Sequence, residues 1–421
     1  MTMTTDATTA TGTAATGSTA GSTDSGRYTI ISSDCHAGAS HEMYREYLDP
    51  AYLDDFDAWR AKYRNPFRDL QEADGGRVRN WDDERRIGDL EADGIVGEVV
   101  FPNTVPPFFP SFVLFARPPR PEEFEHRLAG IRAHNRWMAD WCSRYPERRA
   151  GIGQVFLNDV DEAIKDVRWI KENGLRGGIL LGSVPPDVDY VKPLYDPIYD
   201  PLWAVCEELE VPINSHGGTG SPDYGRYHAS ALLFIAEVSF YSQRPFVQLL
   251  LSGVFERFPR LKFVMTELGT SWIPPMLEQL DRHLGQIRDT GRIGELRFDP
   301  EHILPLSATE YFRRNCWVGA SMPSADDAAA RELIGADRMM WGSDYPHNEG
   351  TFPHTREAIR QRFSDVDETS MRALLGGNAA DLYGFDLDAL APIAQRVGPT
   401  VEELRVPLTE LPDDPSEALL R

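Results

Sequence analysis

Several features that mark other classes of protein are missing from this sequence of 421 residues. Its four cysteines, Cys35, Cys142, Cys206 and Cys316, form no C-x-x-C pair, which argues against a disulfide framework and against a thiolate zinc site. No run of 18 apolar residues is present, and the N-terminus lacks the charged-then-apolar order of a secretory signal. We therefore expect a cytoplasmic protein without a membrane partner.

Positive charge is scarce as well. The chain has 43 Lys and Arg residues against 66 Asp and Glu residues, which gives a formal net charge of −23 at pH 7. A surface of that sign repels phosphate backbones, so we expect no nucleic-acid partner. No G-x-G-x-x-G motif follows a predicted strand, and residues 217–220 are better interpreted as a tight turn than as a phosphate loop.

The chain divides into a body and two tails. Residues 1–26 contain 22 Thr, Ala, Gly or Ser residues and no Leu, Ile, Val or aromatic residue, so we predict a disordered leader. A transit peptide is the competing interpretation, but it should carry arginine, and the first arginine is Arg27. Proline and acidic residues dominate residues 386–421, which predicts an extended arm that packs on the body or on a second subunit.

Eight short β-branched runs recur within the body, residues 27–385, and helical patterns separate many of them. The runs are residues 28–34, 96–102, 149–157, 176–182, 211–216, 261–267, 315–320 and 338–344. Among the helices, one is predicted to begin at Pro245, and another opens with Ser324 and Asp327 as a capping box. This alternation predicts a parallel β/α fold, closed as a barrel or open as a doubly wound sheet.

Polar side chains stand at or just past the ends of four of these runs. Asp34 and His36 follow the first run, His216 the fifth, Glu267 the sixth and Asp344 the eighth. An open sheet would spread these residues apart, whereas a barrel gathers them at one mouth, where barrel enzymes keep their sites. The pattern therefore favours a (β/α)8 TIM barrel.

These residue types suit a divalent metal ion. Asp34 and His36 are two apart on a strand, so their side chains project to the same side. His216 adds a nitrogen and Asp344 an oxygen, a ligand set typical of Zn²⁺, Mn²⁺ or Fe²⁺. Taken singly, each residue has a structural interpretation, since a strand-end Asp often caps the next helix. Four of them at one end of the barrel favour the metal site.

The stretches ISSDCHAG, NSHGGTG, TELGTSWIP and WGSDYPH, in this order, carry a family resemblance. They resemble the amidohydrolase-related proteins of the aminocarboxymuconate-semialdehyde decarboxylase group, also called amidohydrolase family two, over residues 27–385. The resemblance implies a (β/α)8 barrel with one divalent metal at its C-terminal mouth. Zinc is the expected metal, with manganese and iron as alternatives.

The resemblance also implies roles for single residues. Asp34 and His36 match the first-strand metal pair, His216 the fifth-strand ligand, and Asp344 the aspartate that touches the metal and moves protons. Two positions depart from the common pattern. Asp34 stands where many members have histidine, as in some decarboxylases of the group. Glu267 replaces a sixth-strand histidine, and a glutamate can ligate metal or act as a base but cannot present a neutral N–H donor.

Two reactions fit this resemblance. In a hydrolase, metal-activated water loses its proton to Asp344 or Glu267 and attacks an amide, ester or lactone carbonyl. In a nonoxidative decarboxylase of an aromatic or enoic acid, the metal holds the substrate and protonated Asp344 delivers a proton to carbon. We expect a hydrolase, because no arginine cluster for a carboxylate is visible at the strand ends. The decarboxylase is the alternative, and a noncatalytic binding protein, suggested by Glu267, is the second alternative.

Two further residues are candidate substrate contacts. His347 lies three residues after Asp344, and Asn103 opens the aromatic-rich stretch 103–115. We interpret this stretch as a lid or wall for a small aromatic or cyclic substrate, with a subunit contact or ordinary core as the structural alternative. A solvent-facing loop histidine and a turn asparagine are the corresponding alternatives for the two residues. A homodimer is expected from the family and from the C-terminal arm.

Overall fold

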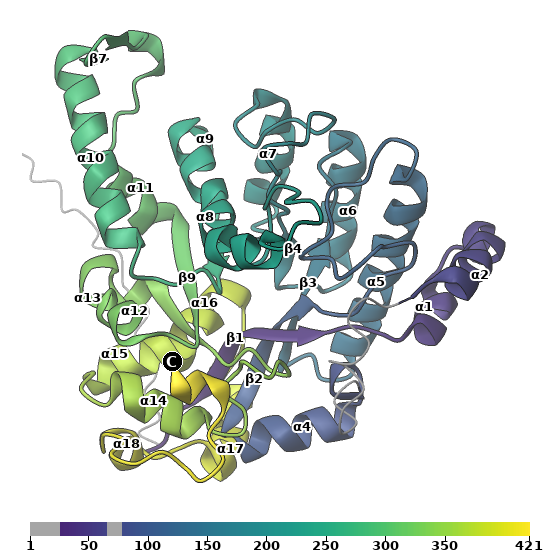
Figure 1. Ribbon diagram of the computed structural model, residues 1–421. Coiled ribbons are helices and arrows are strands. Elements are labelled where there is room, and N and C mark those ends of the chain that lie inside the picture. Colours follow the sequence, from purple (N-terminus) through teal and green to yellow (C-terminus); the bar gives the residue numbers. More distant parts are fainter. Residues whose placement is uncertain (1–25, 65–77) are drawn as a thin grey trace, which may run out of the picture.

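A sheet of eight parallel strands forms the centre of the computed structural model, which describes residues 26–64 and 78–421 (Figure 1). The strands are β1 Ile30–Ala37, β2 Ile95–Pro102, β3 Arg149–Gln154, β4 Gly178–Leu180, β5 Ile213–His216, β6 Phe263–Thr266, β9 Cys316–Ser321 and β10 Met339–Gly342. They are hydrogen-bonded in the order β1-β2-β3-β4-β5-β6-β9-β10. Each predicted run overlaps one of these strands, so their number, order and parallel direction are confirmed.

The sheet closes between its first strand and the segment that follows its last. Asp344 donates its backbone N–H to the carbonyl of Asp34 at 2.9 Å, and His36 donates its own to the carbonyl of Tyr345 at 2.7 Å. Cys35 and Tyr345 form a parallel bridge in the same place. The (β/α)8 barrel is therefore confirmed, and the doubly wound sheet is excluded.

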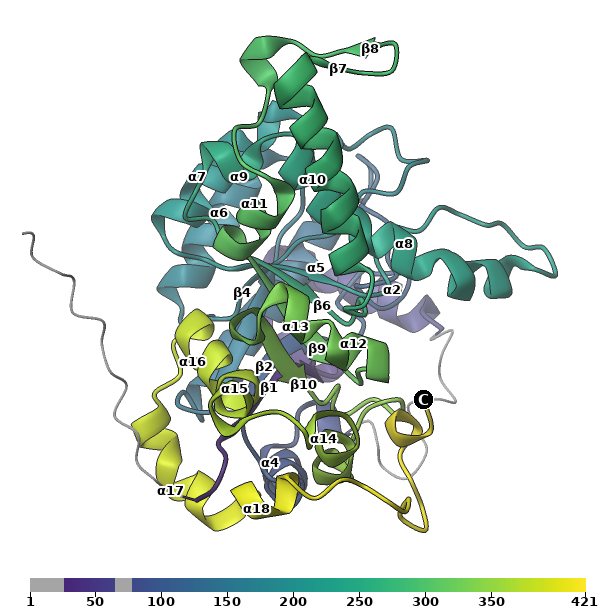
Figure 2. The ribbon, with the colours of Figure 1, turned by 90° about the vertical axis from the view of Figure 1, so that its left-hand side faces the viewer.

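Helices surround the barrel, as the two views at right angles show (Figures 1 and 2). Up to β5 they are α1 His41–Tyr47, α2 Leu53–Lys62, α4 Asp83–Ala92, α5 Phe124–Ser143, α6 Val160–Glu172 and α7 Asp200–Glu208. Between β5 and β10 they are α8 Ser230–Leu251, α9 Val254–Arg257, α10 Ile273–Thr290, α11 Ala308–Asn315, α12 Ala325–Ala329 and α13 Arg331–Ile334. After β10 come α14 Thr355–Phe363, α15 Glu368–Arg372, α16 Asn378–Tyr383, α17 Leu387–Val397 and α18 Val401–Leu404. A hairpin of β7 Arg292–Ile293 and β8 Leu296–Arg297 lies beyond the end of α10.

Helix α8 begins fifteen residues earlier than the sequence predicts. The capping box of Ser324 and Asp327 is present at α12, but Pro245 lies inside α8 rather than at its start. Proline has no N–H to donate to the carbonyl four residues before it, here that of Tyr241. The hydroxyl of Ser183 donates to this carbonyl at 3.5 Å, which supplies a partner from outside the helix. None of the helices in the described ranges has the length and apolar character needed to cross a bilayer.

The two tails differ in how far the structure describes them. The predicted leader, residues 1–26, falls outside the described residues except for its last position. Residues 386–421 were expected to be extended, but much of this segment is helical. Asp386 caps α17 by accepting from two backbone N–H groups, and Leu390 and Ala394 are buried in one apolar cluster with Ile31 of β1. Helix α17 forms because its apolar residues repeat with helical spacing against the barrel.

A buried ion pair fixes the backbone of β1 beneath the polar strand ends. Arg86 of α4 donates to both carboxylate oxygens of Glu98 on β2, with the Nη2 to Oε2 distance at 2.6 Å. Its Nη1 donates to the carbonyl of His36 at 2.8 Å. Neither side chain of the pair is more than 3% exposed. Although burial alone raises the pKa of Glu98, the charge of Arg86 outweighs it and holds that pKa below its usual value.

We expect Glu98→Gln to lower the free energy of unfolding by about 3 to 5 kcal/mol, because it leaves the Arg86 guanidinium buried without its counter-charge. Denaturant titration followed by circular dichroism measures the change. The control is Glu278→Gln, which breaks an exposed pair with Arg282 at 2.7 Å and should change stability by less than about 1 kcal/mol. Equal effects of the two substitutions would contradict the assigned role of the buried pair.

Candidate active site

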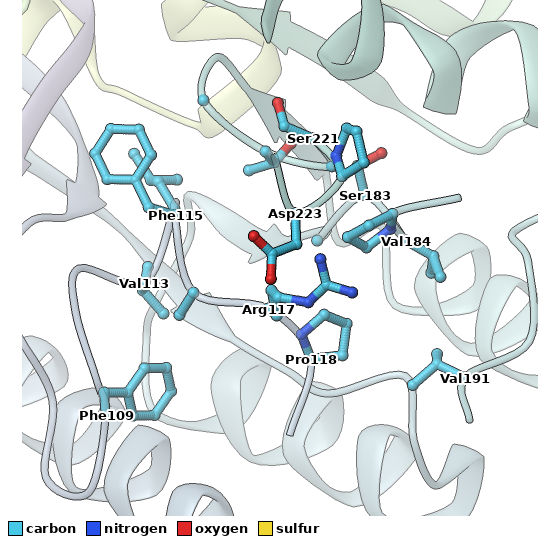
Figure 3. Close-up of a pocket in the computed structure, with 18 of the residues that line it drawn as sticks. Phe109, Val113, Phe115, Arg117, Pro118, Ser183, Val184, Val191, Ser221 and Asp223 are labelled. Carbon is cyan, nitrogen blue, oxygen red and sulfur yellow. The ribbon is translucent and has the colours of Figure 1, made fainter. Parts of the chain in front are cut away.

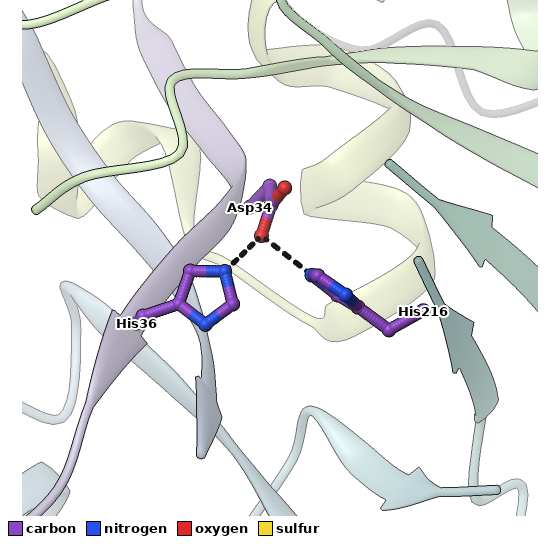
Figure 4. A group of neighbouring side chains, drawn as sticks. All are labelled: Asp34, His36 and His216. Carbon is purple, nitrogen blue, oxygen red and sulfur yellow. Dashed lines mark hydrogen bonds and ion pairs between the residues drawn. The ribbon is translucent and has the colours of Figure 1, made fainter. Parts of the chain in front are cut away.

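Three side chains from β1 and β5 converge inside the C-terminal mouth of the barrel. The Oδ1 atom of Asp34 lies 3.2 Å from Nε2 of His36 and 3.4 Å from Nε2 of His216 (Figure 4). Asp34 and His36 are fully buried, and the His216 side chain is 1% exposed. The other carboxylate oxygen of Asp34 accepts from the hydroxyl of Ser321, the last residue of β9. Asp34 is thus held by side chains from its own strand and from two others, β5 and β9.

The contact of His216 with the backbone fixes which ring nitrogen faces the cluster. Its Nδ1 lies 3.0 Å from the carbonyl of Gly217, to which it donates, so Nε2 is the nitrogen that faces Asp34 and that can bind a cation once its proton is lost. A glycine is needed next to this histidine, because a Cβ at position 217 would lie 2.5 Å from the carbonyl oxygen of Glu267. The sequence His-Gly therefore permits β5 and β6 to approach at this point.

Asp344 joins the cluster from the segment after β10. Its Oδ1 lies 3.2 Å from Nε2 of His36 and 2.8 Å from Nδ1 of His347. Nε2 of His347 in turn lies 3.1 Å from Oδ1 of Asn103. Asn103 donates through its amide nitrogen to Asn80, which leaves its oxygen directed at His347. The structure thus brings together both predicted substrate contacts, His347 and Asn103, but in a hydrogen-bonded chain that leads to Asp344.

Glu267 lies beside the cluster rather than within it. Its Oε2 is 3.5 Å from Nδ1 of His216, on the side of the ring that faces away from Asp34, and its side chain is 27% exposed. It belongs to neither group of mutually close ligand atoms. Glu267 and Asp344 share an uncommon backbone, with φ of 56° and 59°. Non-glycine residues in this left-handed region are strained by about 1 to 3 kcal/mol, and such residues gather at functional sites.

The cluster shifts the pKa values of all its members. Burial alone raises the pKa of Asp34, but His216 and His36 outweigh it and hold that pKa well below its usual range. The carboxylates, acting against burial, raise the pKa of both His36 and His216 to about 9. Burial and the charge of Asp344 raise the pKa of Glu267 to about 7. A divalent cation competes with protons for these atoms, since a ligating imidazole must be neutral.

The donor set fits a divalent metal. Ligand atoms of Asp34, His36 and His216 lie within 4.8 Å of one another, and so do those of His36, Asp344 and His347. Both ring nitrogens of His36 and the Oδ2 atom of Asp344 are buried without a hydrogen-bond partner among the described residues. Imidazole nitrogen combined with carboxylate oxygen suits Zn²⁺, Mn²⁺ and Fe²⁺. The four predicted ligands thus fall into two groups that share His36, with Asp344 and His347 in the second group.

A cavity of about 510 Å³ lies next to this cluster, over the ends of β3, β4 and β5 (Figure 3). Its walls include residues 113–118, which belong partly to the predicted aromatic lid, and residues 218–225, which follow His216. Phe101 of β2 contacts the cluster from one side: its ring centroid is 4.5 Å from that of His216 and 5.8 Å from that of His36. The stretch 103–115 is thus partly core, through Val105 and Phe109, and partly cavity wall.

Sequence reasoning missed several residues of this region. Ser321 ends a strand, so the rule that identified Asp34 and His216 would also have found it. Arg127 and Gln154 line the cavity, but Arg127 lies on a helix, and nothing in its spacing distinguishes it from a surface arginine. Phe101 sits inside an ordinary apolar strand pattern, so its contact with two histidine rings becomes visible only in the folded chain.

Comparison with known sequences agrees with this geometry. The family described as amidohydrolase matches residues 33–385. Gamma-resorcylate decarboxylase of Rhodococcus jostii is 26% identical over 274 residues, which are 63% of this chain and 79% of that protein. The 2-amino-3-carboxymuconate-6-semialdehyde decarboxylase of Dictyostelium discoideum is 25% identical over 315 residues, 73% of this chain and 77% of that protein.

Solved structures share the fold. The 5-carboxyvanillate decarboxylase of Sphingomonas paucimobilis has a TM-score of 0.60 and 22% identity, and the match covers 85% of this chain and 100% of that one. The corresponding enzyme of Novosphingobium aromaticivorans, complexed with manganese and 4-hydroxy-3-methoxy-5-nitrobenzoic acid, has a TM-score of 0.61 and 20% identity, with 85% and 96% covered.

We expect the purified protein to hold about one equivalent of a divalent cation, and His216→Ala to reduce the bound metal to well under half of that amount. Elemental analysis after dialysis measures both values. His302→Ala is the control, because this histidine side chain is 82% exposed and lies outside the cluster. Undiminished metal in His216→Ala would rule out His216 as a ligand.

Proposed function

From the premise that this chain belongs to the amidohydrolase family, we propose that it is an enzyme that catalyses the metal-dependent, nonoxidative decarboxylation of a hydroxy-substituted aromatic acid. The observation that carries the proposal is the Asp344 carboxyl group, which is held against His347 and keeps one buried oxygen without a partner among the described residues. The decarboxylases named among the relatives support the same reaction. Decarboxylation therefore replaces hydrolysis as the preferred activity.

The alternative replaces the expected hydrolase because the relatives named above are decarboxylases. The expectation of a hydrolase rested on the lack of a visible arginine cluster near the strand ends. In the folded chain, Arg127 of α5 lines the cavity without a close counter-charge, although it does not lie at a strand end. The noncatalytic alternative, which the glutamate at position 267 suggested, is less favoured because Glu267 lies beside the two groups of potential ligand atoms and belongs to neither.

We propose that Asp34, His36, His216 and Asp344 hold one divalent cation. The sequence led us to expect zinc. The manganese in a solved structure of the same fold makes Mn²⁺ an equally good candidate for this single site. When bound, the cation supplies positive charge that orients the substrate carboxylate or an adjacent phenol oxygen. The apolar wall of the cavity, which includes Phe109, Val113 and Phe115, would accommodate the aromatic ring.

Asp344 acts in this proposal as the acid that protonates carbon. The Oδ1 of Asn103 accepts from Nε2 of His347, so a second proton lies in the 2.8 Å contact between Nδ1 of His347 and Oδ1 of Asp344. Against burial, His347 holds the pKa of Asp344 below its usual value, so His347 is the group that returns a proton to Asp344 during turnover. The Oδ2 of Asp344 has no hydrogen-bond partner among the described residues, so in this proposal it is the oxygen that carries the proton to the reacting carbon. The proton moves to the ring carbon that bears the carboxylate, the bond between the two carbons breaks, its electron pair restores the aromatic ring, and CO₂ leaves.

Glu267 acts as a second polar group at the site. It lies 3.5 Å from the ring of His216, and the charge that it places there favours the orientation in which Nε2 serves as the ligand. In this proposal Glu267 contributes to catalysis by positioning the ring of His216, and it is not itself a metal ligand.

We also propose that the enzyme is a homodimer. Helix α8 projects from the barrel in Figure 2. Leu232 and Ile235 are 69% and 68% exposed, and Phe240 is 62% exposed. Contiguous apolar surface of this kind on a folded protein marks an interaction site, and a second copy of the chain would bury it.

We expect Asp344→Asn to lower kcat for decarboxylation by about 100-fold or more, because an amide has no acidic proton to transfer. The assay follows CO₂ release from 2,6-dihydroxybenzoate and from 5-carboxyvanillate, with circular dichroism and metal content measured in parallel. Asp337→Asn is the control, since the Asp337 side chain is 70% exposed and belongs to neither group of potential ligand atoms. Full turnover by Asp344→Asn would contradict its role as the acid, and hydrolysis of a lactone without CO₂ release from either acid would contradict decarboxylation.

Glu267→Gln should reduce kcat more than it reduces metal content, because its carboxylate contacts a ligand without being one. The two quantities are measured on the same preparation by steady-state kinetics and elemental analysis. Loss of the metal in proportion to activity would show instead that Glu267 is itself a ligand.

A further inference from the structure

Arg127 stands in the wall of the cavity with its charge nearly unpaired. It lies in the first turn of α5 and is 4% exposed. Its only ion-pair partner among the described residues is Glu123, whose Oε2 is 3.9 Å away and whose side chain is 50% exposed. The Nε of Arg127 is buried and has no hydrogen-bond partner among the same residues. A buried guanidinium is normally paired, so this arrangement is incomplete.

Aromatic rings hold the guanidinium in place. Its central carbon lies 4.3 Å from the ring centroid of Phe109 and 5.5 Å from that of Phe156. Contacts with ring faces stabilise a cation, but they do not satisfy its hydrogen-bond donors. Burial lowers the pKa of Arg127 to about 10, so the side chain remains charged at neutral pH. The site is therefore a fixed positive charge with unused donors.

A second unsatisfied polar side chain lines the same cavity. Gln154, the last residue of β3, is 2% exposed, and neither its Oε1 nor its Nε2 has a hydrogen-bond partner among the described residues. Asn135 of α5 fixes the backbone at this point, since it donates to the carbonyl of Gln154 at 2.9 Å and accepts from its N–H at 2.8 Å. Helix α5 thus carries both Arg127 and the residue that positions Gln154.

Arg117 provides a contrast within the same cavity wall. It is paired with Asp187 at 3.0 Å, and its side chain is 36% exposed (Figure 3 shows its place in the wall). Asp187 also accepts from the backbone of Asp223, so this ion pair joins two loops of the rim. Arg117 thus has a close partner in Asp187, whereas the carboxylate nearest to Arg127 is that of the half-exposed Glu123 at 3.9 Å.

We propose that Arg127 and Gln154 form a subsite that binds an anionic substituent, a carboxylate in the first instance, of the aromatic ligand in the cavity. A guanidinium offers paired donors to the two oxygens of a carboxylate, and the amide of Gln154 adds a further donor. None of the proposed metal ligands lines this cavity, so the subsite is distinct from the metal ligands. This inference rests on the proposed function. The group that the subsite binds is a second acid group of the substrate, distinct from the carboxylate that leaves as CO₂.

Binding of isophthalate, benzene-1,3-dicarboxylate, tests the subsite without requiring turnover. Isothermal titration calorimetry is carried out on the metal-loaded protein and on three variants: Arg127→Met, Arg127→Lys and Arg117→Met. We expect Arg127→Met to weaken binding at least about tenfold, as the loss of a hydrogen-bonded charge does. Arg117→Met, which removes the same charge from the same wall, should change the affinity less than about twofold. Arg127→Lys keeps the charge but not the forked donors, so its affinity should lie between the two.

Three results would overturn the subsite: no binding of isophthalate to the unaltered protein, unchanged affinity in Arg127→Met, or equal losses in Arg127→Met and Arg117→Met. The last result would show a general effect of charge. If Arg127→Met does not fold, the comparison of Arg127→Lys with Arg117→Lys decides the question in the same way. Failure of the decarboxylase assay leaves these binding results intact, and absence of binding leaves the activity on other aromatic acids intact, so the two proposals fail separately.

Discussion

The contact of the Asp34 carboxylate with the imidazoles of His36 and His216 is the interaction on which the rest of the structure depends. In the closed ring of eight strands, β1 and β5 are separated by three strands on either side, so these side chains meet only across the barrel axis. All three are almost completely excluded from water. A buried carboxylate without partners would be strongly destabilising, and here the partners come from the opposite wall. The barrel must therefore close correctly for its site to be tolerated.

The parts of this site that were predictable from the sequence are those that follow from strand geometry. Parallel strands in a barrel present their carboxyl ends at one mouth, and a spacing of two residues places side chains on one side. These two rules led to Asp34, His36 and His216 before any contact was known. Cys35, which lies between Asp34 and His36, points to the other side of the strand, and its sulfur lies 3.4 Å from the hydroxyl of Ser343.

The parts that were not predictable depend on contacts between distant segments. The helical pattern of α8 is interrupted at Pro245, and only the folded chain shows that Ser183 supplies a donor to the carbonyl left without one. Arg127 carries no signal in the sequence, because its distinction is the lack of a nearby counter-charge in three dimensions. The sequence indicates His347 and Asn103 as candidate substrate contacts, but the folded chain joins them by a hydrogen bond that leads to Asp344, which only the contact between distant segments shows.

The strained backbone at Glu267 and Asp344 connects the fold with the chemistry. Both residues follow a strand directly or within two positions, and both leave the extended conformation through positive φ, which only the surrounding hydrogen bonds can maintain. Asp344 donates its N–H to the carbonyl of Asp34, and Glu267 donates its own to that of Gly319. The same bonds that close and brace the barrel thus hold these two carboxyl groups in place. If the backbone relaxed to negative φ, the carboxylate of Asp344 would move away from His36 and that of Glu267 away from His216. The strained backbone is therefore what allows two carboxyl groups with different surroundings to lie at one site.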